Sequence, residues 1–171
     1  MTAVLGLDLS ATATAAVAVP LDWDGRWSSV RSLVVGVKLR RTATDAERAR
    51  RTETIAARVV AFARMHGASV AFIESYAFSQ RTAAHTLAEV GGVVRLELVR
   101  AGVEVRTAPI GTARKLLLGR VPRTDVKQSI LQTLRSAGAT FSSFDEADAF
   151  VAANHGMFEL GGFCFAQGEG A

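Results

Sequence analysis

The sequence predicts an α/β domain in which helices flank a five-stranded mixed sheet. Residues 3–9, 12–19 and 30–38 are apolar or alternating segments joined by short loops, which favours three neighbouring antiparallel strands. From residue 44 onward helical and extended patterns alternate, and strands joined through helices pair in parallel. We therefore expect three antiparallel strands, then parallel strands, with helices packed on the faces of the sheet.

The helix expected at residues 44–65 has the clearest signals. Asp45 and Glu47 lie in its first turn, apolar residues follow at helical spacing, and Gly67 stands just past its end. The other expected elements are a strand at 70–73, a helix at 80–101, a strand at 103–107, and helices at 109–118, 125–137 and 145–155. Together they predict one domain over residues 1–158, followed by a Gly-rich tail at 159–171.

The composition is that of one ordinary globular domain. The chain has 171 residues, of which 49% are hydrophobic and 21% charged, enough to bury a core without disulfides. Its single cysteine, Cys164, has no internal partner and no metal-ligand spacing around it, which argues against zinc. No apolar run approaches the roughly 20 residues that span a bilayer, and Asp8 interrupts the N-terminal apolar stretch. We therefore expect a cytoplasmic protein without a signal peptide or membrane segment.

The excess of basic residues indicates an anionic partner. The formal net charge is +4 and the isoelectric point is about 10.0. Lysine occurs only at Lys38, Lys115 and Lys127, and a lysine retained among so many arginines indicates a need for a compact cation. Arginines crowd the stretch that leads into the first helix, where a solvated helix face is an equally good interpretation: Arg40, Arg41, Arg48, Arg50, Arg51 and Arg58.

Four carboxylates have a pattern that is typical of a metal site. Asp8 ends the apolar run 4–7 and Glu74 ends the run 70–73, and a charge at the end of a buried strand is costly unless a cation or proton neutralises it. Asp145 and Asp148, three apart, share one face of the last expected helix. Hydrolysis of a phosphodiester through two divalent ions needs such a cluster of oxygen ligands. The four residues therefore predict a site for Mg²⁺ or Mn²⁺, with two ions.

Each carboxylate also has a structural interpretation. Asp145 could cap the last helix, because aspartate is a preferred capping residue. Asp8 could be a turn residue before Ser10, and Glu74 could form a salt bridge with an arginine. The convergence of all four on one site remains the favoured interpretation.

Four short motifs occur in the order and spacing of one known family. They are Gly6-Leu7-Asp8, Ile73-Glu74, Ala88-Glu89-Val90-Gly91-Gly92-Val93 and Asp145-Glu146-Ala147-Asp148-Ala149. From residue 3 to about 155 the chain resembles the RuvC family of Holliday-junction resolvases, in the ribonuclease H-like superfamily. The resemblance implies a ribonuclease H-like fold and an endonuclease that resolves four-way DNA junctions by paired nicking. Because one domain with one acidic cluster can make only one nick at a time, we expect a symmetric homodimer.

The resemblance also implies roles for individual residues. Asp8, Glu74, Asp145 and Asp148 would be the catalytic metal ligands, and Lys115 and Lys127 would approach the phosphate as catalytic groups. An aromatic residue after Glu74 would stack on a base, and either Tyr76 or Phe78 fits, the other being a core residue. The residues expected to bind DNA are Tyr76, Phe78, Arg81, Lys115, Arg123 and Lys127.

The chain departs from the family pattern at two places. Leu9-Ser10 follow the first aspartate, where the family usually has Pro-Gly, and Glu89 with Gly92 or Val90 stand where the family has glutamine and arginine. These changes bear on the choice of substrate and not on the metal chemistry.

Two other classes of function stay open at this point. Another ribonuclease H-like nuclease, acting on flaps, replication forks or RNA-containing substrates, would use the same carboxylates. A noncatalytic binding module of the actin-like type also begins with a strand that ends in aspartate, but it needs a second domain and Gly-rich phosphate loops. For the dimer, a stripe on the helix at 80–101 is a candidate contact, unless it packs only on its own sheet: Ala84, Leu87, Ala88 and Gly91.

Overall fold

The structure is a computed structural model that describes residues 2–10, 12–74 and 81–166, with the backbone alone described over 81–86. Its elements are β1 Ala3–Asp8, β2 Thr14–Pro20, the 3-10 helix η1 Trp27–Ser29, β3 Arg31–Val35, α1 Asp45–Met65, β4 Ala68–Glu74, α2 Arg81–Arg100, β5 Glu104–Ala108, α3 Ile110–Leu118, α4 Val126–Ser136 and α5 Phe144–Glu159. Within these residues, no helix is both long and apolar enough to cross a bilayer.

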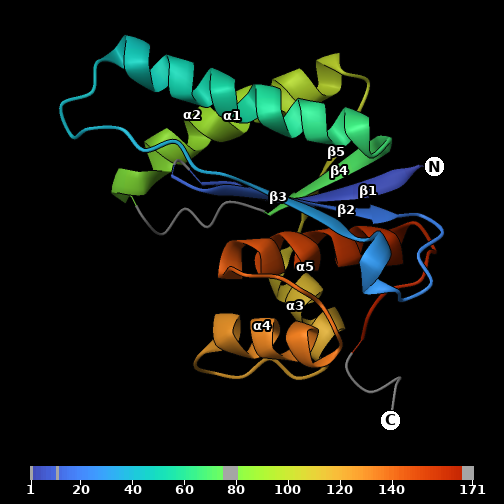
Figure 1. Ribbon diagram of the computed structural model, residues 1–171. Coiled ribbons are helices and arrows are strands. Elements are labelled where there is room, and N and C mark those ends of the chain that lie inside the picture. Colours follow the sequence, from blue (N-terminus) through green and yellow to red (C-terminus); the bar gives the residue numbers. More distant parts are fainter. Residues whose placement is uncertain (1, 11, 75–80, 167–171) are drawn as a thin grey trace.

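The elements form layers around one sheet (Figure 1). Helices α1 and α2 cover one face of the sheet, α5 covers the other, and α3 and α4 pack on the outer side of α5. The strand order is β3-β2-β1-β4-β5, with β1, β2 and β3 antiparallel and β1, β4 and β5 parallel. The predicted mixed sheet is confirmed. Strand β3 is shorter than expected because Val35 pairs with Thr14, the first residue of β2, so residues 36–38 have no partner strand.

The central strand β1 separates two hydrophobic cores. Leu5 and Leu7 belong to the core shared with α1 and α2, whereas Val4 belongs to the core shared with α5. Since side chains alternate along a strand, Gly6 and Asp8 point to the same side as Val4. The final carboxylate of β1 therefore lies on the face that α5 covers.

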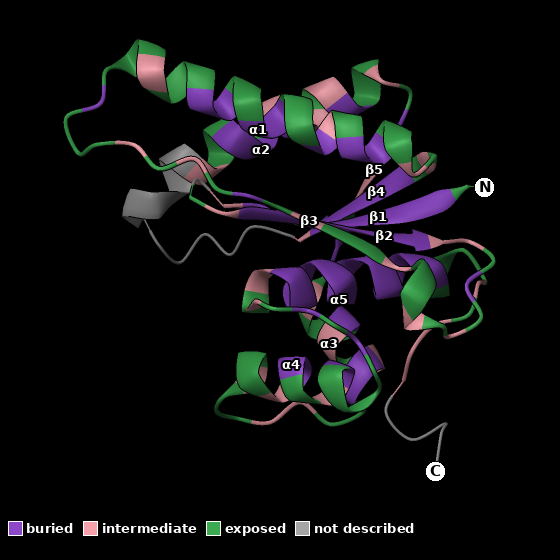
Figure 2. Ribbon diagram, viewed as in Figure 1, coloured by how far each residue is buried: buried purple, intermediate pink, exposed green. Residues whose placement is uncertain are grey.

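Helix α5 is buried on nearly every side (Figure 2), and all residues from 146 to 157 are buried. A helix that buries all of its faces lies in the interior of a fold, and the polar residues among them, Glu146, Asp148, Asn154 and His155, are buried as well. It is longer than the predicted 145–155, because Gly156 does not end it. A Cβ at Gly156 would lie 2.4 Å from the Phe72 ring, so this glycine serves close packing, and the chain turns only at Gly161, with φ of 71°.

Helix α5 lies directly on the backbone of β1. A Cβ atom at Gly6 would lie 2.0 Å from the carbonyl oxygen of Ala149 and 2.4 Å from the backbone nitrogen of Ala153. Real side chains do not approach backbone atoms so closely, so position 6 has room only for glycine. The contact fixes where along β1 the helix sits.

The chain beyond α5 packs back onto the domain. The side-chain amide of Asn154, which is buried, donates to the carbonyl oxygen of Phe165 at 2.8 Å and accepts from its N–H at 2.6 Å. Trp27 meets the Phe165 ring edge-on, with ring centroids 5.7 Å apart. Residues up to Ala166 are thus tied to α5 and to the loop after β2.

The close approach at Gly6 predicts that Gly6→Ala destabilises the protein. We expect the free energy of unfolding to fall by about 1–3 kcal/mol, because the added methyl group forces α5 away from β1. Gly111→Ala is the matched control, since a Cβ there meets nothing within 4 Å on helix α3. It should leave stability unchanged or raise it by up to about 1 kcal/mol. Chemical denaturation of both variants measures the difference, and equal stabilities would contradict the proposed contact.

Candidate metal centre

Two of the predicted carboxylates end neighbouring strands. Leu7 of β1 pairs with Ile73 of β4 in parallel register, so Asp8 and Glu74, the next residues, leave the sheet at the same edge. Phe72 belongs to the core on the α5 side, and Glu74, two residues further, points to that side as well. The sheet therefore delivers both carboxylates to one place beneath the start of α5.

The first turn of α5 positions the other two carboxylates by using a third one as a cap. The hydroxyl of Ser143 accepts from the backbone N–H of Glu146 at 3.2 Å, and the Glu146 carboxylate accepts from the N–H of Ser143 at 3.0 Å. Glu146 also accepts from Ser32 of β3 at 2.7 Å. The interpretation of Asp145 as the helix cap is therefore wrong, because Ser143 and Glu146 form the cap.

Asp148 is held by two cations from neighbouring helices. Arg114 of α3 donates from Nη2 to Oδ1 at 3.2 Å. Lys127 of α4 forms an ion pair with Asp148, with Nζ 2.9 Å from Oδ2. Three helices thus meet at this buried carboxylate.

The charges of the other three acids act on Asp8, and the charge of Asp148 also acts on Glu74. Burial, followed by the charges of Asp148 and Glu74, raises the pKa of Asp8 from 3.8 to about 7, with Asp145 adding to the effect and Lys127 opposing it. Burial and Asp148 also raise the pKa of Glu74, against Arg114 and Lys127. Because neighbouring carboxylates raise the pKa of Asp8 and of Glu74, an additional cation would be stabilising here.

The donor set fits a hard divalent cation. Carboxylate oxygens are the ligands that Mg²⁺ and Mn²⁺ prefer, and here they come from β1, β4 and α5. In their present side-chain positions, however, no three Asp, Glu, His or Cys side chains of the described residues are close enough together to hold an ion. Binding an ion would therefore require these side chains to move.

The cation facing Asp148 on α3 is one that the sequence argument missed. Arg114 points to the site, whereas Lys115, which the resemblance singled out, is exposed. The sequence did contain a signal for Arg114. Ala113, Leu117 and Leu118 form the buried stripe of α3. Residue 114 lies three and four positions before Leu117 and Leu118, and residues at this spacing share one side of a helix. Successive residues are about 100° apart around a helix, so the side chains of Arg114 and Lys115 point in different directions.

The remaining predicted residues lie around or outside this centre. Arg123 is exposed in the segment between α3 and α4. Tyr76 and Phe78 lie outside the described residues, and Arg81 begins α2 with its side chain outside them. His155, two turns beyond Asp148, is buried, and its Nε2 lies 2.9 Å from Glu159 Oε1, away from the acids.

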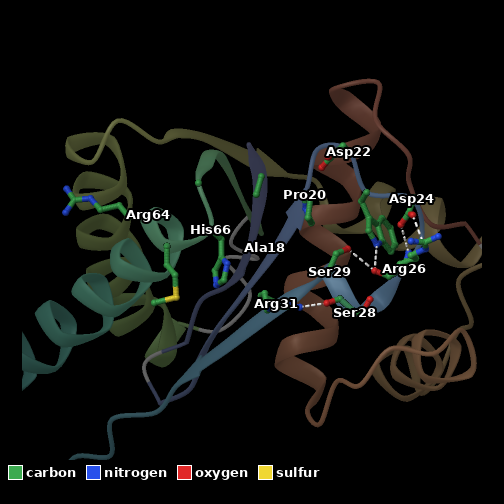
Figure 3. A pocket seen from close by; sticks show the side chains of 14 residues that line it. Ala18, Pro20, Asp22, Asp24, Arg26, Ser28, Ser29, Arg31, Arg64 and His66 are labelled. Carbon is green, nitrogen blue, oxygen red and sulfur yellow. Dashed lines mark hydrogen bonds and ion pairs between the residues drawn. The ribbon is translucent and has the colours of Figure 1, made fainter. Parts of the chain in front are cut away.

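A cavity of about 760 Å³ lies at the other end of the sheet (Figure 3). Arg26 and Ser29 border it on one side and His66 on the other, with Ala18 of β2 between them. Ala3, which begins β1, also lines it. The length of the strand therefore separates this cavity from Asp8, and it is not part of the metal centre.

Solved structures with the same arrangement of elements define the class of this fold. It is the fold of the RuvC-like resolvases, which is ribonuclease H-like. RuvC of Thermus thermophilus in complex with a Holliday junction substrate superposes with a TM-score of 0.70 at 19% identity, covering 95% of this chain and 97% of that one. A Thermus thermophilus RuvC structure gives a TM-score of 0.67 at 18% identity, covering 94% and 97%.

A viral protein has the same fold at lower similarity. The fowlpox virus resolvase, in a complex with its substrate Holliday junction DNA, gives a TM-score of 0.52 at 9% identity, covering 92% of this chain and 98% of that one. No protein-family model and no curated protein matches the sequence. The predicted fold class is confirmed by structure.

The raised pKa of Asp8 predicts that stability falls with pH in the presence of a chelator. Asp8 keeps its proton up to about pH 7 in the folded state but loses it near 3.8 when unfolded. The folded state therefore binds more protons between these values, and the free energy of unfolding decreases as pH rises through the window and levels off above it. Denaturation at several pH values should show a smaller decrease for Asp8→Asn. Asp22→Asn, an exposed aspartate, is the control, and identical slopes for the two variants would contradict the assignment.

Proposed function

We propose that this protein is a divalent-metal-dependent endonuclease that resolves four-way DNA junctions. The observation that supports the proposal most is that Asp8 and Glu74 end neighbouring strands at one edge of the sheet, where the charges of Asp145 and Asp148 act on Asp8. The fold supports the choice of junctions, because its solved neighbours include a RuvC and a viral resolvase in complex with Holliday junction DNA.

The four carboxylates would hold two Mg²⁺ or Mn²⁺ ions. Asp8 would be the ligand shared by both ions, because the charges of Asp148, Glu74 and, least of all, Asp145 each raise its pKa. When bound, such ions activate the attacking water and stabilise the charge on the transferring phosphate. Asp148 is buried and the other three acids are half-buried, and partial burial strengthens the electrostatic interactions among them.

Basic residues near this edge would bind the DNA backbone. Asp8 pairs with Ala15, and Ala15 pairs with Val34, so the segment that runs from β3 into α1 leaves the sheet at the edge of the acids. That segment and the first turns of α1 carry exposed arginines, and α4 adds Lys127. Contacts of this kind follow the phosphates and make binding depend strongly on salt. The exposed arginines are Arg40, Arg41, Arg48 and Arg50.

The active unit would be a homodimer, with a contact surface on α2 that differs from the expected stripe. Gly91 is buried and Leu87 packs on the core of its own chain, so these two residues do not form an outer surface. The outward-facing apolar residues at helical spacing, here called the α2 stripe, are Ala88, Gly92, Leu96 and Val99. A two-fold dimer through this stripe would present two centres to a substrate that is itself two-fold symmetric.

Junction cleavage tests the proposed chemistry. The wild-type protein with Mg²⁺ should cut a mobile four-way junction on two symmetry-related strands, and cleavage by Asp8→Asn, Glu74→Gln and Asp148→Asn should fall below detection. Binding to the junction should survive in each variant, because phosphate contacts come mainly from basic residues. Flap and RNA–DNA hybrid substrates run in parallel, and faster cutting of either one would favour another ribonuclease H-like nuclease.

Light scattering tests the dimer. Leu96 and Val99 are 48% and 59% exposed, and a Leu96→Glu substitution would place two like charges near the two-fold axis. We expect this variant to be monomeric and to produce single nicks in place of paired cuts. Met65→Glu makes the same apolar-to-acidic change at an exposed site at the end of α1 and should remain dimeric. A monomeric wild-type protein whose two cuts occur independently would contradict the proposal.

A further inference from the structure

Asp148 is the most enclosed carboxylate of the candidate centre. Only 2% of its side chain is exposed, and an ionised carboxylate that is so buried is stable only when it is paired. Oδ1 faces Arg114 at 3.2 Å and Oδ2 faces Lys127 at 2.9 Å. Each oxygen is therefore engaged by a different positive group of the same chain.

The two cations are attached in different ways. Arg114 is 22% exposed, donates a hydrogen bond to Asp148, and extends from α3, which packs on α5. Lys127 is 52% exposed and forms an ion pair with Asp148 Oδ2. Lysine is a strongly hydrated charge on a flexible stem, so Lys127 is the cation that can leave.

The ammonium group and a divalent ion would compete for the same oxygen. Two cations cannot share Oδ2 at contact distance without strong repulsion in a buried site. With Asp148 engaged by Arg114 and Lys127, no three acidic, histidine or cysteine side chains of the described part of the chain stand close enough to hold an ion. The present arrangement is therefore one in which the protein's own cations compensate the buried charge.

We propose that Lys127 is an exchangeable counter-ion of Asp148. It occupies Oδ2 until a divalent ion replaces it, while Arg114 stays on Oδ1 and keeps the carboxylate in position. This exchange rests on the proposed function only in that the centre must bind divalent ions. It adds that Lys127 lowers the affinity of the centre for those ions. The displaced Lys127, being half exposed, then becomes free to meet a phosphate of the nucleic acid.

Calorimetric titration of Mg²⁺ and of Mn²⁺ into the full chain, without DNA, tests the exchange. Lys127→Gln should bind the ion roughly three- to tenfold more tightly than the wild-type protein, because no cation has to be displaced. Lys38→Gln removes the same charge from an exposed site and should stay within about twofold of the wild-type affinity. Equal affinities for Lys127→Gln and Lys38→Gln would overturn the proposal.

Thermal unfolding in a chelator distinguishes the two cations. Arg114→Gln should lower Tm by several degrees more than Lys127→Gln, since it removes the enclosed, hydrogen-bonded partner of Asp148. Arg114→Lys should recover part of the loss because it restores the charge. If Lys127→Gln lowers Tm as much as Arg114→Gln does, Lys127 is a fixed structural partner and the exchange is wrong.

Junction cleavage by the wild-type protein is measured separately. Ion affinities in the expected order, without any cleavage of four-way junctions, would overturn the proposed function and support the exchange. Cleavage of junctions, with no gain in ion affinity for Lys127→Gln, would support the proposed function and overturn the exchange.

Discussion

The contact between the backbone of β1 and the backbone of α5 is the constraint on which the rest of the structure depends. Gly6 lies against Ala149 and Ala153, so the axis of α5 is fixed relative to the strand. Moving from Gly6 to Asp8 along the strand corresponds to moving one turn toward the start of the helix, where Asp145 and Asp148 stand. The acidic cluster therefore results from a packing contact that contains no functional side chain.

Three acids within four residues of α5 have three different roles, and their positions on the helix decide which. Glu146 satisfies the N-terminal backbone groups together with Ser143, and its several hydrogen bonds outweigh burial and lower its pKa. Asp148 is buried between helices and is balanced by Arg114 and Lys127. Asp145 is partly exposed and contributes to the raised pKa of Asp8. The same chemical group thus acts as a cap, a buried partner and a candidate ligand.

Local sequence patterns predicted the elements and their order well, because strand and helix periodicity depend on neighbouring residues. The antiparallel-then-parallel sheet and the positions of Asp8 and Glu74 followed from the apolar runs that they end. The resemblance pointed to Lys115, whereas in the structure Arg114 contacts Asp148. Which of the two faces Asp148 depends on how α3 is rotated on α5, and in the sequence only the buried stripe of α3 indicates that rotation. The end of β3 also depended on its partner, because pairing stops where β2 begins.

The outer face of α2 shows the same limit. Apolar spacing indicated a stripe, but it could not tell which side of the helix meets α1 and which meets solvent, because both sides carry small and apolar residues. Such a choice depends on contacts with residues that are distant in the sequence.

The glycine and alanine residues of the β1–α5 contact also bear on how far such a chain can diverge. The contact requires the absence of side chains at a few positions and places little demand on the residues elsewhere, provided that their apolar pattern is kept. A fold held in this way can retain its shape while most of its residues change, which agrees with a TM-score of 0.70 at 19% identity. The constraint on this fold is therefore the room that Gly6 leaves for the backbone of α5 and that Gly156 leaves for the ring of Phe72.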